Sequence, residues 1–210
     1  MKKILLFGPQ GAGKGTQAER LAKHLNLPAL SMGDLLRREQ QKGTEIGREI
    51  VEIMTKGGLV SDQIAVEVLK ARLNEPDAAE GYIIDGYPRN LEQYKAYIAF
   101  DQPTDVIVID VPDEESLKRL AGRRTCVGCG KVYHVDFARP KVADICDTCG
   151  GSLVQREDDK PEAILKRLGI YHNETEPMAK EFEVLGVLRR VDGMGSIDEV
   201  EEKIRKALDV

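Results

Sequence analysis

An apolar segment that runs directly into a glycine-rich turn constrains this chain more than any other feature. Residues 5–8 (LLFG) are followed by residues 9–16 (PQGAGKGT), and residues 17–22 (QAERLA) have the composition of a helix. Glycines let successive backbone N–H groups face one anion, and a helix N-terminus adds a positive dipole end. The order of strand, glycine-rich turn and helix therefore predicts a phosphate-binding loop in an α/β protein.

Two side chains of this loop have predicted roles. Lys14 is expected to bind the β- and γ-phosphates as a point charge, and the Thr16 hydroxyl to contact the Mg²⁺ that bridges them. Gly15 is inserted before the hydroxyl residue of the usual GxxxxGK[ST] pattern. A plain turn with a solvated lysine is the alternative, and the flanking strand and helix disfavour it. The loop predicts a site for a nucleoside triphosphate, but it does not indicate which molecule would accept a phosphoryl group from it.

Composition narrows the class of protein. The 210 residues suffice for one large domain with small insertions, and 41% apolar with 32% charged residues is typical of a soluble protein. We expect a cytoplasmic location, because no apolar run approaches about 20 residues and a strand begins directly after residues 1–3. The net charge of −5 disfavours general nucleic-acid binding. We expect no membrane partner and a monomer.

Two later apolar segments end in an aspartate, at 81–85 (GYIID) and 106–110 (VIVID). In P-loop proteins an acid at such a strand end orients the Mg²⁺ shell. We favour Asp85 because the turn after it delivers Arg89, a phosphate-binding partner. Asp110 leads instead to a proline and an expected helix cap at Asp113, so we assign it a structural role.

Apolar periodicity and capping residues predict the remaining elements. Ser31 or Asp34 is expected to cap a helix, and Ser196 to form a capping box with Glu199. Between residues 31 and 60 the pattern is a helical excursion between two core strands, at the sheet edge where α/β proteins bind ligands. The other expected elements are strands at 27–30 and 187–191 and helices at 44–56, from 61, at 113–122 and from 161.

Two CxxCG motifs stand sixteen residues apart, in a segment, 125–158, without helical periodicity. Two short turns that each present two thiolates predict a tetrahedral zinc site with the ligands Cys126, Cys129, Cys146 and Cys149. Redox-active CxxC motifs act singly at a helix start, so they are the weaker interpretation. Because all four ligands come from the protein, the metal is expected to be structural. His134 is expected to pack or to contact a nucleotide rather than to bind metal.

Together these motifs resemble the adenylate kinase family, in its long bacterial form with a zinc-bearing lid. The resemblance covers essentially the full chain. It rests on GPQGAGKGTQ at 8–17, LSMGDLLR at 30–37, DGYPRNLEQ at 85–93, RLAGRR at 119–124, KVYHVDF at 131–137, QREDD at 155–159, KRL at 166–168 and the two cysteine motifs.

The resemblance implies a reversible transfer of the γ-phosphoryl group of MgATP to AMP, which gives two ADP. It also implies a P-loop fold with a parallel five-stranded sheet flanked by helices. The implied division is a core of residues 1–30, 61–122 and 160–210, a helical NMP-binding insertion at 31–60, and a zinc-binding lid at 123–159. Closure of the two insertions would keep water, a competing acceptor, from the phosphoryl group.

The resemblance also implies roles for individual residues. The residues that match the ATP site are Gly11, Ala12, Gly13, Lys14, Gly15, Thr16, Arg119, over the base, and Arg123. Those that match the AMP site are Ser31, Met32, Arg37, Val60, Gly86, Arg89, Gln93, Arg156 and Arg167. The implied catalytic set is Lys14, Arg89, Arg123, Arg156 and Arg167, and Thr16 and Asp85 would serve Mg²⁺ largely through water.

Two residues depart from the family pattern. Met32 stands where a threonine usually contacts the AMP base, and Gln10 replaces a proline. An asparagine at position 90, after Pro-Arg, is similar to the pattern of the pyrimidine monophosphate kinases. Gln93 instead favours adenine, because its amide can pair with both the ring nitrogen and the amino group of that base. AMP is the first choice of acceptor, with UMP and CMP as rivals. A non-catalytic nucleotide-binding zinc module is a further alternative, which the acceptor-side arginines disfavour.

Overall fold

The computed structural model describes residues 1–210, and its main feature is a sheet of five parallel strands. In space the strands follow the order β2-β3-β1-β4-β8, so the first strand lies at the centre. This confirms the predicted parallel five-stranded sheet of an α/β fold. The strands are β1 (Lys2–Phe7), β2 (Ala29–Ser31), β3 (Gly81–Asp85), β4 (Asp105–Asp110) and β8 (Leu188–Asp192).

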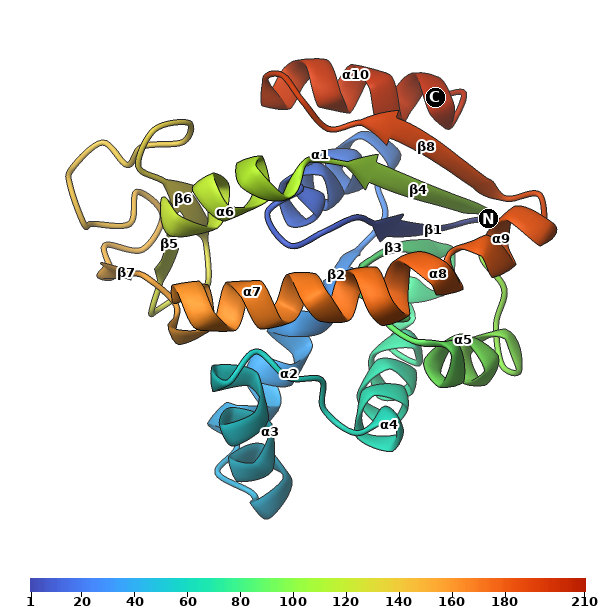
Figure 1. Cartoon of the computed structure of the whole chain (residues 1–210), viewed down its shortest axis with the longest axis horizontal. Helices are drawn as coiled ribbons and strands as arrows, with labels where there is room; N and C mark the ends of the chain where they lie inside the picture. The colour runs from blue at the N-terminus through green and yellow to red at the C-terminus, as the bar shows by residue number, and fades with distance from the viewer.

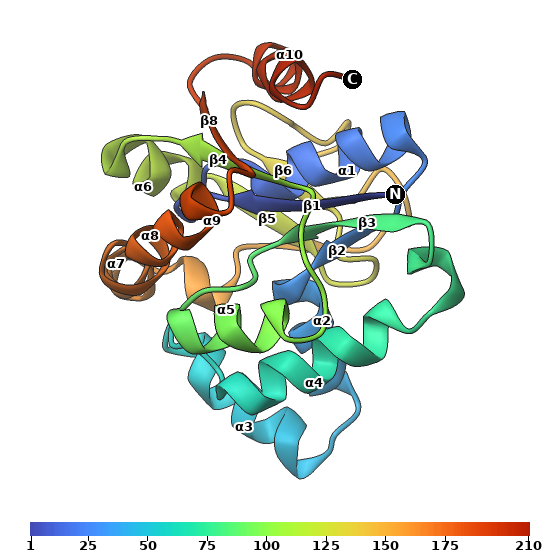
Figure 2. The same ribbon diagram turned by 90° about the vertical axis from the view of Figure 1, so that its right-hand side faces the viewer.

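Helices cover both faces of this sheet, which is why its strands are apolar throughout rather than alternating. Ile4 and Leu6 of β1 face a layer that includes α1 (Lys14–Leu25) and α10 (Ile197–Ala207). Leu5 faces the opposite layer, in which α4 (Asp62–Leu73) and α5 (Leu91–Ile98) pack. Figure 2 shows the sheet between these layers. Successive residues of a strand thus belong to two separate cores.

The segment 31–60 forms two helices below the sheet in Figure 1, α2 (Met32–Gln41) and α3 (Glu45–Thr55). Ser31 is the cap of α2, since its hydroxyl accepts from the backbone N–H of Asp34 at 3.3 Å. The helix predicted at 44–56 is confirmed. So is the capping box of the terminal helix, in which the side chains of Ser196 and Glu199 both bond the backbone.

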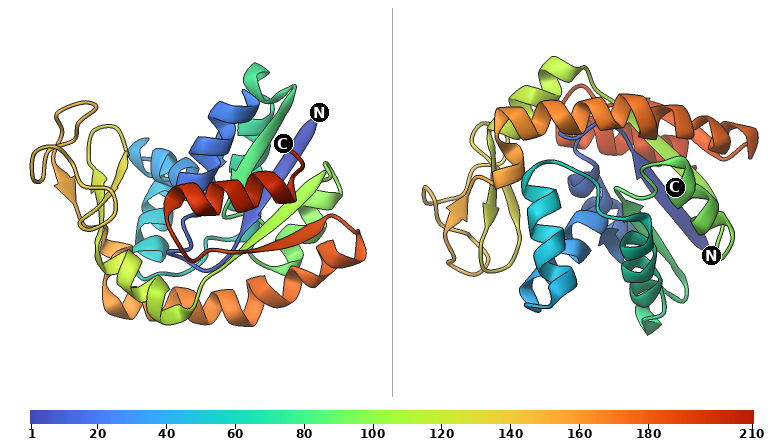
Figure 3. Two further views of the ribbon diagram at one scale, coloured as in Figure 1. Left: turned by 90° about the horizontal axis from the view of Figure 1, so that it is seen from above. Right: turned by 60° about the horizontal axis from the view of Figure 1, so that its bottom comes forward.

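A second, smaller sheet stands apart from the main one (Figure 3). It contains β5 (Arg123–Cys126), β6 (Val132–His134) and β7 (Leu153–Val154), all antiparallel, with β5 in the middle. The chain reaches it through α6 (Asp113–Ala121) and leaves through η2 (Glu157–Asp159) and α7 (Pro161–Ile170). We call the segment from β5 to η2, residues 123–159, the lid.

Three local features differ from the expectation or were not fixed by the sequence pattern. The cap of α6 is Pro112, which has no side-chain bond to offer, so the prediction that Asp113 caps this helix is wrong. The pattern gives no bounds for α5. After α7 the chain continues through η3 (Tyr171–Thr175), a π-helical turn, into α8 (Glu176–Met178) and α9 (Lys180–Val184). A short helical turn, η1 (Pro76–Ala78), precedes β3.

None of the helices combines the length and the apolar character needed to cross a membrane.

Candidate active site

A cleft of about 870 Å³ opens at the carboxyl ends of the parallel strands. Its walls come from the phosphate loop, the start of α2, the turn between β3 and α5, the lid and α7. In open α/β sheets ligands bind at this edge. Every residue predicted to bind a nucleotide lies on the wall of this single cleft, and so does Asp85. The zinc ligands lie outside it.

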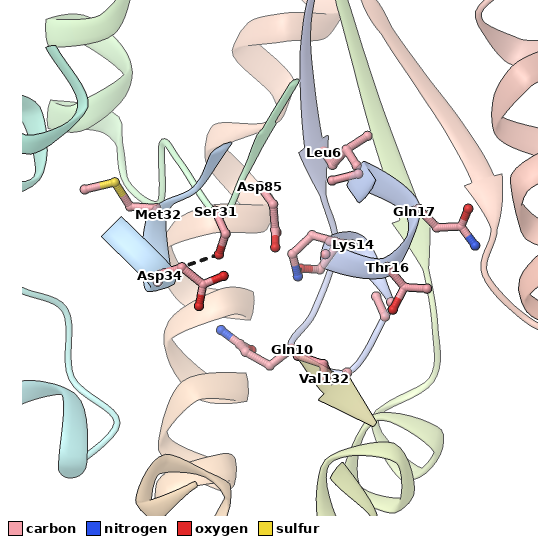
Figure 4. A pocket seen from close by; sticks show the side chains of 18 of the residues that line it. Leu6, Gln10, Lys14, Thr16, Gln17, Ser31, Met32, Asp34, Asp85 and Val132 are labelled. Carbon is pink, nitrogen blue, oxygen red and sulfur yellow. Dashed lines mark hydrogen bonds between the residues drawn. The ribbon is translucent and has the colours of Figure 1, made fainter. Parts of the chain in front are cut away.

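The phosphate loop places Lys14 at the first turn of α1, whose N-terminus faces the cleft (Figure 4). The loop needs glycine at Gly8, where a Cβ atom would lie 2.4 Å from the carbonyl oxygen of Ile109. Gly13 has a φ of +89°, a left-handed conformation that favours glycine. The Lys14 ammonium donates to the carbonyl oxygens of Gly8 and Pro9, at 2.8 Å each.

Several buried, positively charged side chains lie close together on the floor of the cleft. Burial, reinforced by the positive charges of Arg89, Arg167 and Arg123, lowers the pKa of Lys14 to about 8, and the Asp85 carboxylate opposes this shift. Burial also lowers the pKa of Arg89. Buried cationic side chains repel each other unless an anion compensates their charge. The cleft is therefore suited to a highly charged anion such as a polyphosphate.

The lid and α7 contribute three more arginines. Arg123 donates from Nε to Asp159 at 2.7 Å, and Arg167 donates to the carbonyl oxygen of Asp158 at 2.9 Å. Arg156 donates to the hydroxyl of Thr125 at 2.8 Å and contacts no carboxylate within salt-bridge distance. Burial, with Arg123 adding repulsion, lowers the pKa of Arg156 to about 10. Asp158 and Asp159 thus hold two guanidinium groups in place at the mouth of the lid.

Most of the predicted acceptor residues lie on the wall formed by α2 and the turn between β3 and α5, and the exceptions are Arg156 in the lid and Arg167 on α7. Arg37 donates to Asp34, one turn away on α2, and Arg89 donates to the carbonyl oxygen of Gly86 at 2.8 Å. Ser31, Val60 and Gln93 also line this wall. Met32 lines it too, but only 3% of its surface is exposed, and Figure 4 shows its side chain directed away from Lys14. Its thioether packs with the core rather than standing free in the cleft.

The two strand-end aspartates differ in surroundings. Asp85 lines the cleft, and Figure 4 shows its carboxylate facing Lys14. Asp110 does not line the cleft, and its two oxygens accept from Nε and Nη2 of Arg190 at 2.9 and 2.6 Å. An acid whose oxygens are both paired is a poor partner for a hydrated cation. This placement fits the assignment of the magnesium role to Asp85 and of a structural role to Asp110.

The lid side of the cleft contains Arg119 and His134, which the sequence predicted to lie near a nucleotide, together with Phe137 and Gly193, for which no individual role was predicted. Arg119 donates to Glu115 at 2.8 Å and to the carbonyl oxygen of Gly193, in the loop after β8, at 3.2 Å. The rings of His134 and Phe137 stack in the lid with centroids 4.4 Å apart. Both rings line the cleft beside β6. They belong to the KVYHVDF motif, whose aromatic residues were the available signal for a base-stacking surface.

The four cysteines meet at one end of the lid. Their sulfur atoms all lie within 4.8 Å of one another, although they come from two separate turns. Two of the separations are 3.4 Å, between Cys126 and Cys149, and 3.6 Å, between Cys129 and Cys146. The corners of a tetrahedron with Zn–S bonds of about 2.3 Å are about 3.8 Å apart, so the thiols fit a zinc ion. The glycines after the two motifs have φ values of +76° and +72°.

Further groups surround these sulfurs. The backbone N–H groups of Gly128 and Thr148 each lie 3.4 Å from a cysteine sulfur, as donors that favour a thiolate. The Tyr133 hydroxyl, 3.5 Å from the sulfur of Cys146, lowers the pKa of that thiol to about 6. At Cys146 these groups therefore stabilise the charged form in which cysteine binds metal.

The fold and the cleft define a P-loop kinase with cationic walls for two phosphate-bearing substrates, that is, a nucleoside monophosphate kinase. A sequence model of the family described as "Adenylate kinase" matches residues 6–187. The chain belongs to the adenylate kinase family, as its motifs indicated, and is a phosphotransferase.

Relatives named adenylate kinase match nearly the whole chain. The protein of Methanothrix thermoacetophila is 45% identical over 98% of this chain and 97% of its own length. That of Methanosarcina barkeri is 44% identical with the same coverage. That of Acetivibrio thermocellus is 41% identical, again over 98% of this chain and 97% of the relative. The likeness therefore includes the lid and the insertion as well as the main sheet.

Proposed function

We propose that this chain transfers the γ-phosphoryl group of MgATP to AMP and catalyses the reverse reaction. The observation that carries the proposal is the convergence of Lys14, Arg89, Arg123, Arg156 and Arg167 on one cleft from four parts of the chain. Phosphoryl transfer requires little covalent chemistry from a protein. Alignment of the two nucleotides and neutralisation of the transferring oxygens supply most of the rate.

Each wall of the cleft has its own task. The loop from Gly11 to Thr16 holds the donor phosphates, with Arg119 and the lid aromatics at the donor base. Arg37 and Arg89 bind the acceptor phosphate. Thr16 and Asp85 would hold Mg²⁺, which bridges the donor phosphates and offsets their charge when bound. Arg123, Arg156 and Arg167 then lie between the two nucleotides and stabilise the charge that develops in transfer.

The division into three parts supports exclusion of water. Residues of the segments 31–60 and 123–159 both line the cleft, and so does the phosphate loop, which belongs to the remaining segments. Movement of both walls toward the loop would displace water, the competing acceptor, from the transferring group. We assign to the four cysteines a structural zinc ion that keeps the lid folded and takes no part in the chemistry.

AMP is the proposed acceptor because Gln93 lies on the acceptor wall with an amide that can match the adenine edge. The test is a panel of AMP, CMP, UMP, GMP and IMP with MgATP, followed as ADP formation, with zinc content determined on the same sample. AMP is expected to give the highest kcat/KM. If no monophosphate accelerates ADP formation the kinase function is wrong, and if UMP leads the panel the acceptor is wrong.

A further inference from the structure

Gln93, the proposed reader of the acceptor base, is held by two groups with opposite hydrogen-bonding character. Its Oε1 accepts from the backbone N–H of Arg89 at 2.9 Å. Its Nε2 donates to Oδ1 of Asp62 at 2.9 Å. Only 2% of the Gln93 surface is exposed, so water offers it few alternatives. Both ends of the amide are therefore specified by the protein.

This pairing fixes the amide in one of its two orientations. A backbone N–H can only donate, and an ionised carboxylate can only accept. Rotation of the Gln93 amide by half a turn would place its oxygen against the Asp62 carboxylate and its NH₂ against the Arg89 N–H. Two hydrogen bonds would be lost and two repulsive contacts would form inside a buried site. The flipped amide is excluded as long as residue 62 is an acceptor.

Asp62 is itself held in place. It is the first residue of α4, and its Oδ1 also accepts from Nδ2 of Asn90 at 2.8 Å. Asn90 in turn caps α5, because its Oδ1 accepts from the backbone N–H of Gln93 at 2.8 Å. Asp62 and Asn90 line a separate groove between α3, α4 and α7, whereas Gln93 lines the substrate cleft. Asp62 therefore reaches the substrate only through Gln93.

After these bonds the amide retains one hydrogen on Nε2 and one lone pair on Oε1, and the structure gives neither a partner. A donor beside an acceptor complements a base whose ring nitrogen accepts and whose neighbouring amino group donates. Adenine and cytosine have this pattern. Hypoxanthine, guanine and uracil have the reverse, a ring N–H beside a carbonyl oxygen. Those bases would need the flipped amide.

We infer that Asp62 is a positioning residue that locks the Gln93 amide and so selects amino-base over oxo-base monophosphates. The inference rests on the proposed role of Gln93 in binding the acceptor base. It predicts the order of kcat/KM among the acceptors: AMP should exceed IMP, and CMP should exceed UMP. A carboxylate in the first turn of α4 also stabilises the helix through its dipole. If Asp62 had only this role, its replacement would not affect base selection.

The test compares kcat/KM for AMP and for IMP, which differ only at the edge that Gln93 would read. D62N is the main variant, because an asparagine amide can turn to accept from or donate to Gln93. This removes the constraint at Nε2 and leaves the Arg89 N–H as the only part of the lock that opposes the flipped orientation. We expect the AMP:IMP ratio to fall by about tenfold to a hundredfold, the range for loss of a hydrogen bond to a charged group. D62S, whose hydroxyl also donates or accepts, serves if D62N folds poorly.

The matched control is E67Q. Glu67 lies on the same helix, is exposed, and accepts from the Gln63 amide at 3.0 Å, but it lines neither the cleft nor the groove. It should keep the wild-type ratio. Q93A should abolish most of the preference for AMP, and D62N added to Q93A should change the ratio no further, because the two residues act in one chain of contacts.

Three results would overturn the inference. A fall of both kcat/KM values by the same factor in D62N and D62S would indicate a structural role alone. A change of the ratio by D62N that is as strong in Q93A as in the wild type would mean that Asp62 acts by another route. A wild-type ratio in Q93A would rule out both the lock and the proposed base contact. Failure of the proposed function is distinct from these, because the wild type would then phosphorylate neither AMP nor IMP.

Discussion

The main sheet and the lid differ in how their strands are held together. The main sheet lies between two apolar clusters of 18 and 13 buried residues. The lid has a cluster of four, and two of its members are the cysteines Cys126 and Cys146. Valines and aromatics such as Val127 and Phe137 remain more than half exposed there. Burial can stabilise the first region, but the second needs a cross-link.

We propose that this difference combines a floor fixed by the main core with a lid that would move as a unit. The phosphate loop is continuous with β1 and α1 and is fixed by the main core. The lid meets that core through α6 and α7, where Leu120, Ile164 and Leu168 form a small cluster of their own. A metal-linked lid would keep Arg123 and Arg156 in a fixed relation while the whole segment changes its distance from the loop.

Removal of the metal should have the largest effect and separates the two regions most directly. A strong chelator, or C126S, is expected to abolish protection of lid amides from hydrogen exchange, because binding of structural zinc contributes free energy on the order of 10 kcal/mol. Amides of β1 and β4 should stay protected, the melting temperature should fall, and residual turnover should persist. Hydrogen exchange by mass spectrometry measures each segment.

T148A is the matched control for C126S, since Thr148 lies within the second cysteine motif and its hydroxyl only accepts from Lys131 at 3.1 Å. It should leave exchange in the lid unchanged. Equal loss of protection in the lid and in β1 would contradict the separation of the two regions. Complete loss of turnover with the fold intact would contradict a purely structural metal.

Cavities of similar size should have different consequences in the two regions. Ile84 in β3 is fully buried, and I84A should lower the free energy of unfolding of the whole chain by about 2–5 kcal/mol. Leu153 is buried in the lid, but L153A should open the lid locally and leave the main transition in place. Urea unfolding followed by circular dichroism gives the first quantity and hydrogen exchange the second. A comparable shift of the main transition in both variants would show that lid and sheet unfold together.

Sequence alone predicted the features that depend on local patterns. The phosphate loop, a helix cap at Ser31 or Asp34, the capping box at Ser196 and the cysteine motifs are each specified within a few residues. The partners of buried polar groups are not, because they lie far apart in the chain. Arg123 meets Asp159 across 36 positions, and Gln93 meets Asp62 across 31. Such pairs depend on how helices pack, and one sequence contains no periodic signal for them.

A pairing at the junction between the two regions predicts the smallest effect. His172, in the turn after α7, bonds Glu176 at 2.8 Å and Asp113, the first residue of α6, at 3.0 Å. Hydrogen bonds to Glu176 and then to Asp113 raise the pKa of His172 in the folded protein. Besides His172, Arg190 is the one cationic side chain within 4 Å of these carboxylates: it lies 3.9 Å from Glu176 and is also paired with Asp110.

A raised folded pKa means that the stabilising contribution is complete below the unfolded value of about 6.5 and is lost as the pH rises through the folded pKa. His172 is 44% exposed, so solvent screening limits the contribution to about 1 kcal/mol or less. Calorimetry from pH 6 upward should show a small fall in melting temperature, about 2–4 °C at most for a chain of this size. H172Q should remove this component of the pH dependence, and high salt should weaken it in the wild type. An identical pH profile in H172Q would mean that the link between α6 and the turn after α7 does not depend on this charge.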